Sequence, residues 1–159
     1  MKVSIAAIGR VKGVFADSLA EYEKRASRYF SFETVEIREH PSHRAANRQE
    51  VMQEEGTRIL ARVPDGFDLV ALHREGKSWS SEKLSEYLAG LALDSRPGVV
   101  FAIGGAFGLS DAVLRRADHR LSLSGFTFPH EMARLILTEQ IYRAGTIARG
   151  EPYHKGGGG

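Results

Sequence analysis

The sequence predicts a single α/β domain with a largely parallel sheet, and two observations support this fold class. Short apolar runs of strand length alternate along the chain with segments whose apolar residues recur every three or four positions. The run at 98–103 (GVVFAI) is apolar throughout, which is typical of a central parallel strand buried on both faces. We therefore expect a mainly parallel sheet of five or six strands, with helices on both faces.

The first elements follow from local pattern. The apolar run at 2–9 predicts a strand, and the periodic segment at 17–30 predicts an amphipathic helix capped near Asp17. Residues 33–40 alternate between apolar and polar side chains. Such alternation predicts a strand with one wet face, so we expect this strand at an edge of the sheet.

A helix-start pattern marks the next element. Asn47 is followed three residues later by Glu50, which predicts a helix over 47–62. Pro64 cannot continue a helix and ends it. The apolar run at 67–72 then predicts a third strand.

The remaining elements lie on both sides of the central strand at 98–103 in the chain. A serine begins each of the helices expected at 80–93 and 110–117. A short fifth strand is expected at 119–123, and the last helix at 130–148. We assign 1–155 to one domain and leave the four glycines at 156–159 out of it, as a flexible tail.

Composition limits the function classes. Lys and Arg total 22 against 20 Asp and Glu, so the net charge of +2 does not by itself indicate a nucleic-acid partner, although the surplus lies after residue 118. The chain has no cysteine, which excludes disulfides, a thiol nucleophile and thiolate metal ligands. His40 and His43 have no evident third ligand, so no metal site is expected. Because no segment resembles a signal peptide or approaches a membrane span of ~20 apolar residues, a cytoplasmic protein is expected.

Three loops leave the carboxyl ends of predicted strands, where open parallel sheets bind ligands. They lie at 73–79, 104–110 and 124–129. The first contains Gly76-Lys77-Ser78, but the phosphate-binding loop pattern also requires a glycine at position 71, which is Ala71. Nucleotide hydrolysis is therefore disfavoured, and a solvated loop is the alternative.

The glycine-rich loop at 104–108 allows two interpretations. Residues without a Cβ atom serve either a tight turn or a nucleoside-like ligand that approaches the backbone closely. Further along, Glu139 and Arg143 are spaced for an ion pair within a helix. The closing Tyr153-His154-Lys155 combines an aromatic ring, a titratable group and a cation, which suits an RNA base and its phosphate. A frayed chain end is the alternative there.

Three ordered motifs resemble the RlmH family of SPOUT (α/β-knot) methyltransferases: IGGAFGLS at 103–110, LSLSGFTFPHEMARLILTEQIYRA at 121–144 and PYHK at 152–155. The resemblance extends over the full chain. It implies a C-terminal trefoil knot, which periodicity could not have indicated. It also implies a homodimer that uses S-adenosylmethionine to methylate N3 of a pseudouridine in helix 69 of 23S ribosomal RNA, within the assembled ribosome.

The resemblance also assigns residues to the cofactor. By position, it implies that the adenosine is bordered and wrapped by Leu72, Gly104, Gly105, Gly108, Leu123, Ser124, Gly125, Phe126, Thr127 and Phe128. His73 stands where many relatives have an acidic residue, which puts in doubt any role of an acid at that position.

The reaction class suggests roles for the C-terminal residues. Methyl transfer from a sulfonium is an in-line displacement, and the N3 imide is nucleophilic only after it loses its proton. We expect His154 to accept this proton, Tyr153 to stack on the base, and Arg143 and Lys155 to anchor phosphates or carbonyl groups. Two alternatives stay open: another SPOUT RNA methyltransferase, and a ribosome-associated RNA-binding module without catalysis.

Overall fold

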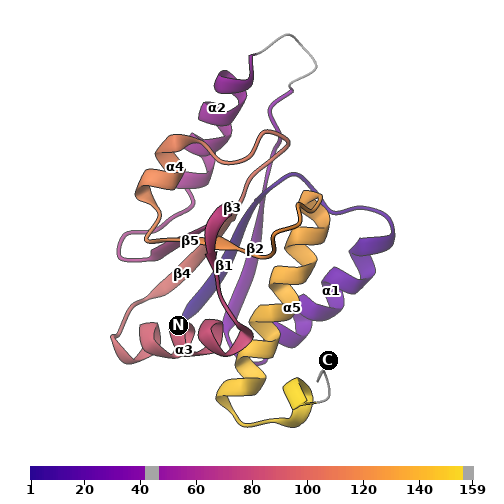
Figure 1. Cartoon of the computed structure of the whole chain (residues 1–159), viewed down its shortest axis with the longest axis vertical. Coiled ribbons are helices and arrows are strands. Elements are labelled where there is room, and N and C mark those ends of the chain that lie inside the picture. Colours follow the sequence, from indigo (N-terminus) through magenta and orange to yellow (C-terminus); the bar gives the residue numbers. More distant parts are fainter. Residues whose placement is uncertain (42–46, 156–159) are drawn as a thin grey trace.

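The described residues form one parallel sheet in a computed structural model that covers residues 1–41 and 47–155 (Figure 1). The strand order is β2-β1-β4-β3-β5, and every pair of neighbours is parallel. The strands are β1 (Lys2–Ile8), β2 (Ser31–Ile37), β3 (Asp68–Ser78), β4 (Gly98–Ile103) and β5 (His119–Ser122). The predictions of a central position for β4 and an edge position for β2 are confirmed.

Helices cover both faces of this sheet, as predicted. They are α1 (Val14–Ala26), α2 (Arg48–Leu60), α3 (Ser81–Leu93), α4 (Asp111–Arg116) and α5 (His130–Ala148), with a 3₁₀ turn η1 (Pro152–Lys155). Helices α1, α3 and α5 pack on one face, and α2 and α4 on the other (Figure 1). Each face of the sheet has its own hydrophobic core, and successive residues of β1 pack into the two cores alternately. Ile5 faces α3 and α5, whereas Ala6 faces α2 and α4.

The predicted helix starts are confirmed at three helices and wrong at one. The side chains of Asn47, Ser80 and Ser110 accept hydrogen bonds from backbone N–H groups three residues later, at 2.8, 3.0 and 3.3 Å. Helix α1 instead begins at Val14 after Gly13, without a side-chain cap, and Asp17 lies in its first turn. An acidic residue in the first turn is also favourable there, because it complements the helix dipole.

Strand β3 is longer than predicted. It does not end at residue 72 but continues to Ser78, and the expected loop is a bulge within it. Leu72 and Lys77 both pair with Leu121, so residues 73–76 project from the sheet. The apolar-run criterion missed this extension because the residues beyond 72 are mainly polar.

The chain crosses to the α1 side of the sheet after β5. Helix α5 packs between α1 and α3, and its Leu137, Ile141 and Ala144 are buried. The trefoil knot implied by the family resemblance stays a prediction. Within the described residues, each helix is too short or too polar to cross a membrane.

Candidate cofactor and RNA site

A cavity of about 510 Å³ lies at the carboxyl edge of the sheet, where β4 and β5 end and the bulge of β3 begins. Its walls come from the loops after β4 and β5, from the bulge of β3, and from the starts of α2 and α5. Cavities of this size hold small organic ligands, and this edge is where open parallel sheets bind them.

The structure brings the three loops predicted from strand ends together. Nine of the ten residues assigned to the cofactor line the cavity, namely Leu72, Gly104, Gly105, Gly108, Leu123, Ser124, Phe126, Thr127 and Phe128. Gly125 does not line it. Phe126 is 80% exposed, so this ring stands at the mouth of the cavity and not in its interior.

The glycine-rich loop forms a tight turn, which confirms one of its two interpretations. The Gly108 N–H donates to the Gly105 carbonyl at 3.0 Å, and Gly108 has a φ of +83°, which favours glycine. A Cβ atom on Gly104 would lie 2.7 Å from the carbonyl carbon of Gly108. The glycine at 104 is therefore required by the loop itself, and the same turn forms a wall of the cavity.

The loop after β5 is held by its own serines. The Ser122 hydroxyl donates to the Ser124 carbonyl at 2.9 Å, and the Phe126 N–H donates to the Ser124 hydroxyl at 3.0 Å. Side-chain-to-backbone bonds of this kind fix a turn without secondary structure. The Leu123–Phe128 wall of the cavity is thus shaped before any ligand binds.

The ionisable side chains around the cavity are mainly basic. Arg48, His73, Arg74 and His130 line it, with Asp111 as the single carboxylate among its described lining residues. At His73, the Glu75 N–H donates to Nδ1 at 3.2 Å, so the neutral ring carries its proton on Nε2. This lining suits an anionic partner such as RNA at the mouth.

Sequence reasoning missed a buried carboxylate behind the glycine turn. Glu55 is 4% exposed; its Oε2 accepts from the His40 N–H at 3.1 Å, and its Oε1 has no hydrogen-bond partner among the described residues. Burial raises the pKa of this carboxyl group. One feature of the sequence could have indicated this burial. Glu55 lies four residues after Val51 and four before Ile59, so it falls on the same buried stripe of α2 as these two apolar residues.

The predicted ion pair at the end of α5 is confirmed and has a third member. Glu139 Oε1 accepts from Arg143 Nε and Nη2 at 3.0 and 2.6 Å, and from the Tyr153 hydroxyl at 3.0 Å. The Tyr153 ring lies 4.6 Å from the Tyr142 ring, centroid to centroid, and the Arg143 guanidinium lies 4.9 Å from the Tyr153 centroid. Tyr153 is thus packed onto α5, contrary to the interpretation as a frayed end.

These contacts set the protonation of the cluster. Burial, with hydrogen bonds to Tyr22 and Glu139, raises the pKa of Tyr153, so its hydroxyl stays protonated at neutral pH. The hydrogen bond to Glu139 raises the pKa of Arg143. His154 is half-buried, and its Nδ1 has no hydrogen-bond partner among the described residues. The side chain of Lys155 lies outside the described part of the chain.

The predicted catalytic residues do not meet the cofactor cavity of their own chain. Helix α5 starts at the cavity with His130 and ends 18 residues later at Ala148. At 1.5 Å per residue it is about 27 Å long. The turn η1 with Tyr153 and His154 packs at its far end (Figure 1).

The described ranges 1–41 and 47–155 contain no group of three or more His, Cys, Asp or Glu side chains that could hold a metal ion. His40 is described, and its Nε2 lies 2.9 Å from Glu54 Oε2. His43 lies outside the described residues, so the prediction about this histidine pair stays a prediction.

Comparisons with known proteins agree with this architecture. The family model "Predicted SPOUT methyltransferase" matches residues 1–154. "Ribosomal RNA large subunit methyltransferase H" of Pelotomaculum thermopropionicum is 48% identical over 158 residues, covering 96% of this chain and 98% of that protein. The protein of that name in Clostridioides difficile is 42% identical over 159 residues, covering 98% of this chain and all of that one.

A solved structure supports the fold alone. "Crystal structure of an hypothetical protein" matches with a TM-score of 0.51 at 15% identity, and the match covers 92% of this chain and 80% of that one. The family model and the two relatives each span nearly the whole chain. This chain therefore belongs to the SPOUT methyltransferase family, and within it to the group of the ribosomal RNA large subunit methyltransferases H.

Proposed function

We propose that this chain transfers a methyl group from S-adenosylmethionine to N3 of a pseudouridine in helix 69 of 23S ribosomal RNA. As a SPOUT methyltransferase it is an enzyme that uses this cofactor. The observation that carries the proposal is the cavity of about 510 Å³ built from the three loops at the carboxyl edge of the sheet. Because the proposed substrate is the assembled ribosome, the proposed location is the cytoplasm.

The cavity residues fit the cofactor by their chemistry. Leu72, Leu123 and Phe128 offer apolar surface for the faces of an adenine, and the backbone of the 123–128 loop offers donors and acceptors for its edge. The Gly104 backbone provides close approach to the ligand. When bound, the cofactor supplies a methyl group on a positively charged sulfur.

We call residues 151–155, which include the turn η1, the tail from here on. These residues and Arg143 fit the RNA half of the reaction. His154 is proposed to take the proton from N3, because the imide nitrogen attacks only as an anion. Arg143 and Lys155 are proposed to stabilise the resulting charge on the uracil carbonyls or to hold a phosphate. Tyr153 stays protonated, so its proposed contribution is its ring face and the anchoring of the tail to Glu139.

The length of α5 supports a homodimer. His154 and the cofactor cavity lie at opposite ends of a helix about 27 Å long, too far apart for in-line transfer within one protomer. In a dimer with two-fold symmetry, the tail of one protomer would complete the cavity of its partner. We propose this arrangement, with the domain of each protomer comprising residues 1–155 and the C-terminal segment knotted.

Incubation of the protein with methyl-labelled S-adenosylmethionine and either assembled ribosomes or free 23S RNA tests the function. We expect label at N3 of a helix 69 pseudouridine, located by mass spectrometry of nuclease fragments. Label on another base would assign the chain a different SPOUT specificity. RNA binding without label, and without cofactor binding by calorimetry, would make it a binding module.

A further inference from the structure

A second surface of chemical interest lies along the free edge of the sheet, outside the cofactor cavity. Strand β5 is the outermost strand, next to β3. We call the surface around it the β3–β5 strip. It consists of Arg74, Lys77, Trp79, Arg116, His119 and Arg120.

The bulge of β3 places the basic residues of the strip together. Arg120 pairs with Ala71 on β3, and its neighbour Leu121 pairs with Lys77. Gly76 lies so near β5 that a Cβ atom on it would be 2.6 Å from the Arg120 carbonyl carbon. Arg74, Lys77 and Arg120 therefore lie on adjoining backbone segments of this edge, and all three side chains are exposed. By register Lys77 lies on the face of Leu121 and Arg120 on the face of Ala71, so the two cations flank the edge strand on its two sides.

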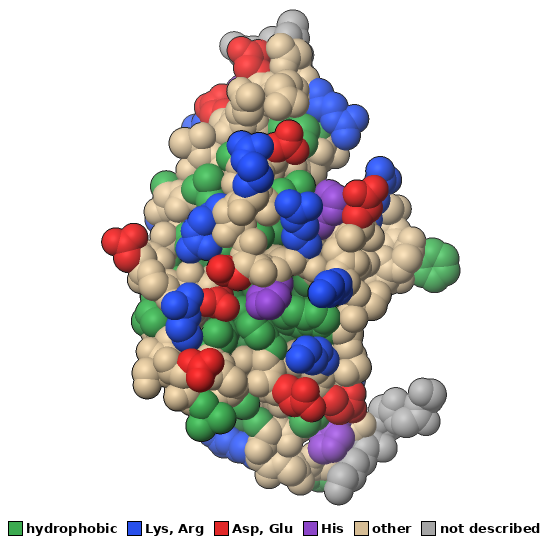
Figure 2. All heavy atoms as spheres, turned by 60° about the vertical axis from the view of Figure 1, so that its left-hand side comes forward, with side chains coloured by type: hydrophobic (Ala, Val, Ile, Leu, Met, Phe, Trp, Pro, Cys, Tyr) green, Lys and Arg blue, Asp and Glu red, His purple; other side chains and the backbone are tan. Residues whose placement is uncertain are grey.

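The charge of the strip is positive after its internal pairs are formed. Two carboxylates lie beside its four cationic side chains: Glu75, exposed within the bulge between Arg74 and Lys77, and Asp118. Asp118 is already engaged, since its Oδ2 accepts from Arg116 Nη1 at 3.1 Å and from the Leu69 N–H at 2.8 Å. The Arg120 guanidinium donates to a carbonyl oxygen, that of Leu114, and this bond leaves its charge uncompensated. Figure 2 shows basic side chains on either side of a histidine on this face of the molecule, with acidic side chains next to it as well.

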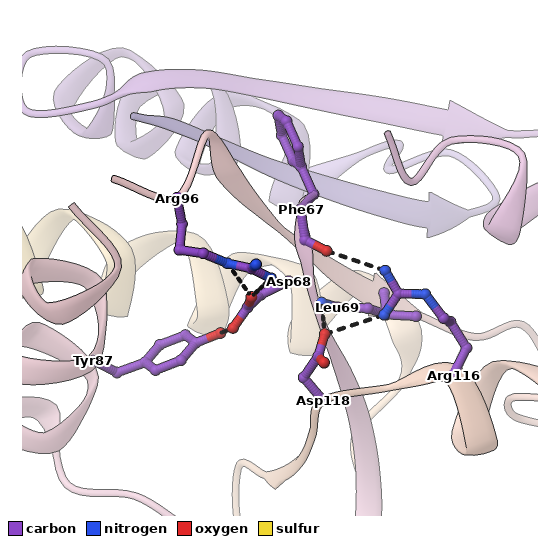
Figure 3. A network of polar contacts seen from close by, with 7 residues as sticks. All are labelled: Phe67, Asp68, Leu69, Tyr87, Arg96, Arg116 and Asp118. Atoms are coloured by element: carbon purple, nitrogen blue, oxygen red, sulfur yellow. Dashed lines mark hydrogen bonds and ion pairs between the residues drawn. The ribbon is translucent and has the colours of Figure 1, made fainter. Parts of the chain in front are cut away.

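An aromatic cluster lies on the α3 side of the same sheet edge, the side of Lys77. The exposed His119 ring makes edge contacts with Trp79 and Tyr87, at centroid distances of 5.4 and 5.0 Å, and Trp79 and Tyr87 are 5.0 Å apart. The Tyr87 hydroxyl donates to Asp68 Oδ2 at 2.9 Å, and Arg96 Nε donates to Asp68 Oδ1 at 3.0 Å (Figure 3). The cluster is therefore held in place before any partner arrives.

We propose that the β3–β5 strip binds a single strand of ribosomal RNA next to the reacting nucleotide, with phosphates on Arg74, Lys77 and Arg120 and a base stacked on the His119–Trp79 cluster. A basic track beside aromatic rings is the chemistry that binds single-stranded nucleic acid. Arg74 also lines the cofactor cavity, so a strand on the strip leads into that cavity. The inference rests on the proposed function, because it takes the substrate to be ribosomal RNA.

The first test is the salt dependence of ribosome binding. We expect Lys77→Gln and Arg120→Gln each to weaken binding to assembled ribosomes about three- to tenfold at fixed salt, and to reduce the slope of log K against log salt by about 0.7–0.9. The matched control is Arg62→Gln, an exposed arginine just after α2, at the end of that helix away from the cavity. It should keep both the affinity and the slope.

The second test maps the contact directly and exploits the absence of cysteine in the chain. An iron–EDTA group tethered to Ser78→Cys, exposed beside Trp79, should cleave ribosomal RNA near the methylated nucleotide. The matched control is Ala61→Cys, exposed at the C-terminal end of α2, which should cleave elsewhere or not at all. Thermal melting checks that each variant is folded.

The outcomes separate this inference from the proposed function. In one outcome the wild-type protein methylates helix 69, but the strip variants bind ribosomes with the wild-type slope of log K against log salt, and Ser78→Cys cleaves like its control. The strip is then not an RNA contact. If the variants change the dimer fraction by light scattering and leave RNA affinity intact, the strip is a protein interface and the inference is wrong. If the strip variants show the reduced slope of log K against log salt but no methyl label appears in RNA, the proposed reaction is wrong and the RNA contact stands.

Discussion

The Tyr153 hydroxyl donates a hydrogen bond to Glu139 Oε1 across 3.0 Å, and Arg143 donates to the same oxygen. One carboxylate oxygen thus ties the turn η1 to α5. The turn bears His154, so the proposed base is carried by an anchored segment. These few residues therefore contribute both to the stability of the fold and to the proposed catalysis, and different substitutions should separate the two contributions.

Removal of all residues after Glu151 should abolish methylation and also lower the melting temperature. Ring packing on Tyr142 and the bond to Glu139 are both lost. Each kcal/mol lost should lower the melting temperature by about 2–4 °C in a chain of this size. Calorimetry of the truncated protein measures the shift, and Tyr153→Phe, which keeps the ring, should cost only about 1 kcal/mol. An unchanged melting temperature on truncation would show that the packing of Tyr153 stabilises nothing.

His154→Ala should lower turnover at saturating ribosomes by about a hundredfold or more, while RNA affinity changes only a few-fold. A base acts in the transition state, so its loss affects rate before binding. The deficit should shrink at alkaline pH, where N3 loses its proton without help. A constant ratio of wild-type to variant rates across that pH range would argue against His154 as the base.

Gly104→Val should weaken cofactor binding more than tenfold, about 1.4 kcal/mol, as measured by calorimetry. A valine places its Cβ 2.7 Å from the Gly108 carbonyl carbon, so the turn must open and the cavity wall must move. Gly90→Ala on α3, where a Cβ atom meets nothing within 4 Å, is the matched control and should bind normally. Equal affinity of a folded Gly104→Val protein would place the cofactor elsewhere.

Mixing Gly104→Val and His154→Ala, at a cofactor concentration too low for Gly104→Val to act alone, should restore activity if the tail acts in the partner's cavity. Gly104→Val damages one cavity and His154→Ala one tail. In an equal mixture half of the dimers combine the two chains, and each such dimer keeps one intact site, so about a quarter of wild-type activity should return. Methylation assays before and after subunit exchange measure it. No recovery, with exchange proven by light scattering of a tagged partner, would place both functions in one protomer.

Glu55→Gln should remove a pH-dependent loss of stability. Burial raises the pKa of Glu55 above the ordinary value of 4.5. Between pH 4.5 and this raised pKa, the folded protein keeps a proton on Glu55 that the unfolded chain has released. The free energy of unfolding of the wild type should therefore fall, relative to the glutamine variant, as pH rises through and above 4.5. Urea unfolding of both proteins from pH 4 to 8 measures the difference. Parallel stability curves would mean that Glu55 titrates normally.

The fold was largely predictable because local patterns agree with tertiary structure in most elements. The apolar run of β4 and the caps at Asn47, Ser80 and Ser110 each depend on neighbouring residues only. The extension of β3 depends instead on the close approach of β5 to Gly76, a contact between distant segments. A polar run carries no local sign of such pairing.

The sequence predicts those parts of the candidate site that are loops at the carboxyl ends of strands. The rule for parallel sheets located the loops after β4 and β5, but it has no bearing on Arg48 and Met52, which reach the cavity from α2 through packing. The sequence spacing of the motifs also could not show that His154 lies far from the cofactor cavity of its own chain. That separation follows from the straight course of α5, which only the structure shows.

The rigid connection between cavity and tail also limits how the chain can change length. One extra residue within α5 would rotate everything beyond it by about 100° and shift it by 1.5 Å, so Tyr153 would lose its contacts with Glu139 and Tyr142. A turn such as the one between α3 and β4 absorbs an insertion without moving either end of α5. Gains and losses of residues across this family should therefore accumulate in connecting turns, and the number of residues from His130 to Tyr153 should stay constant.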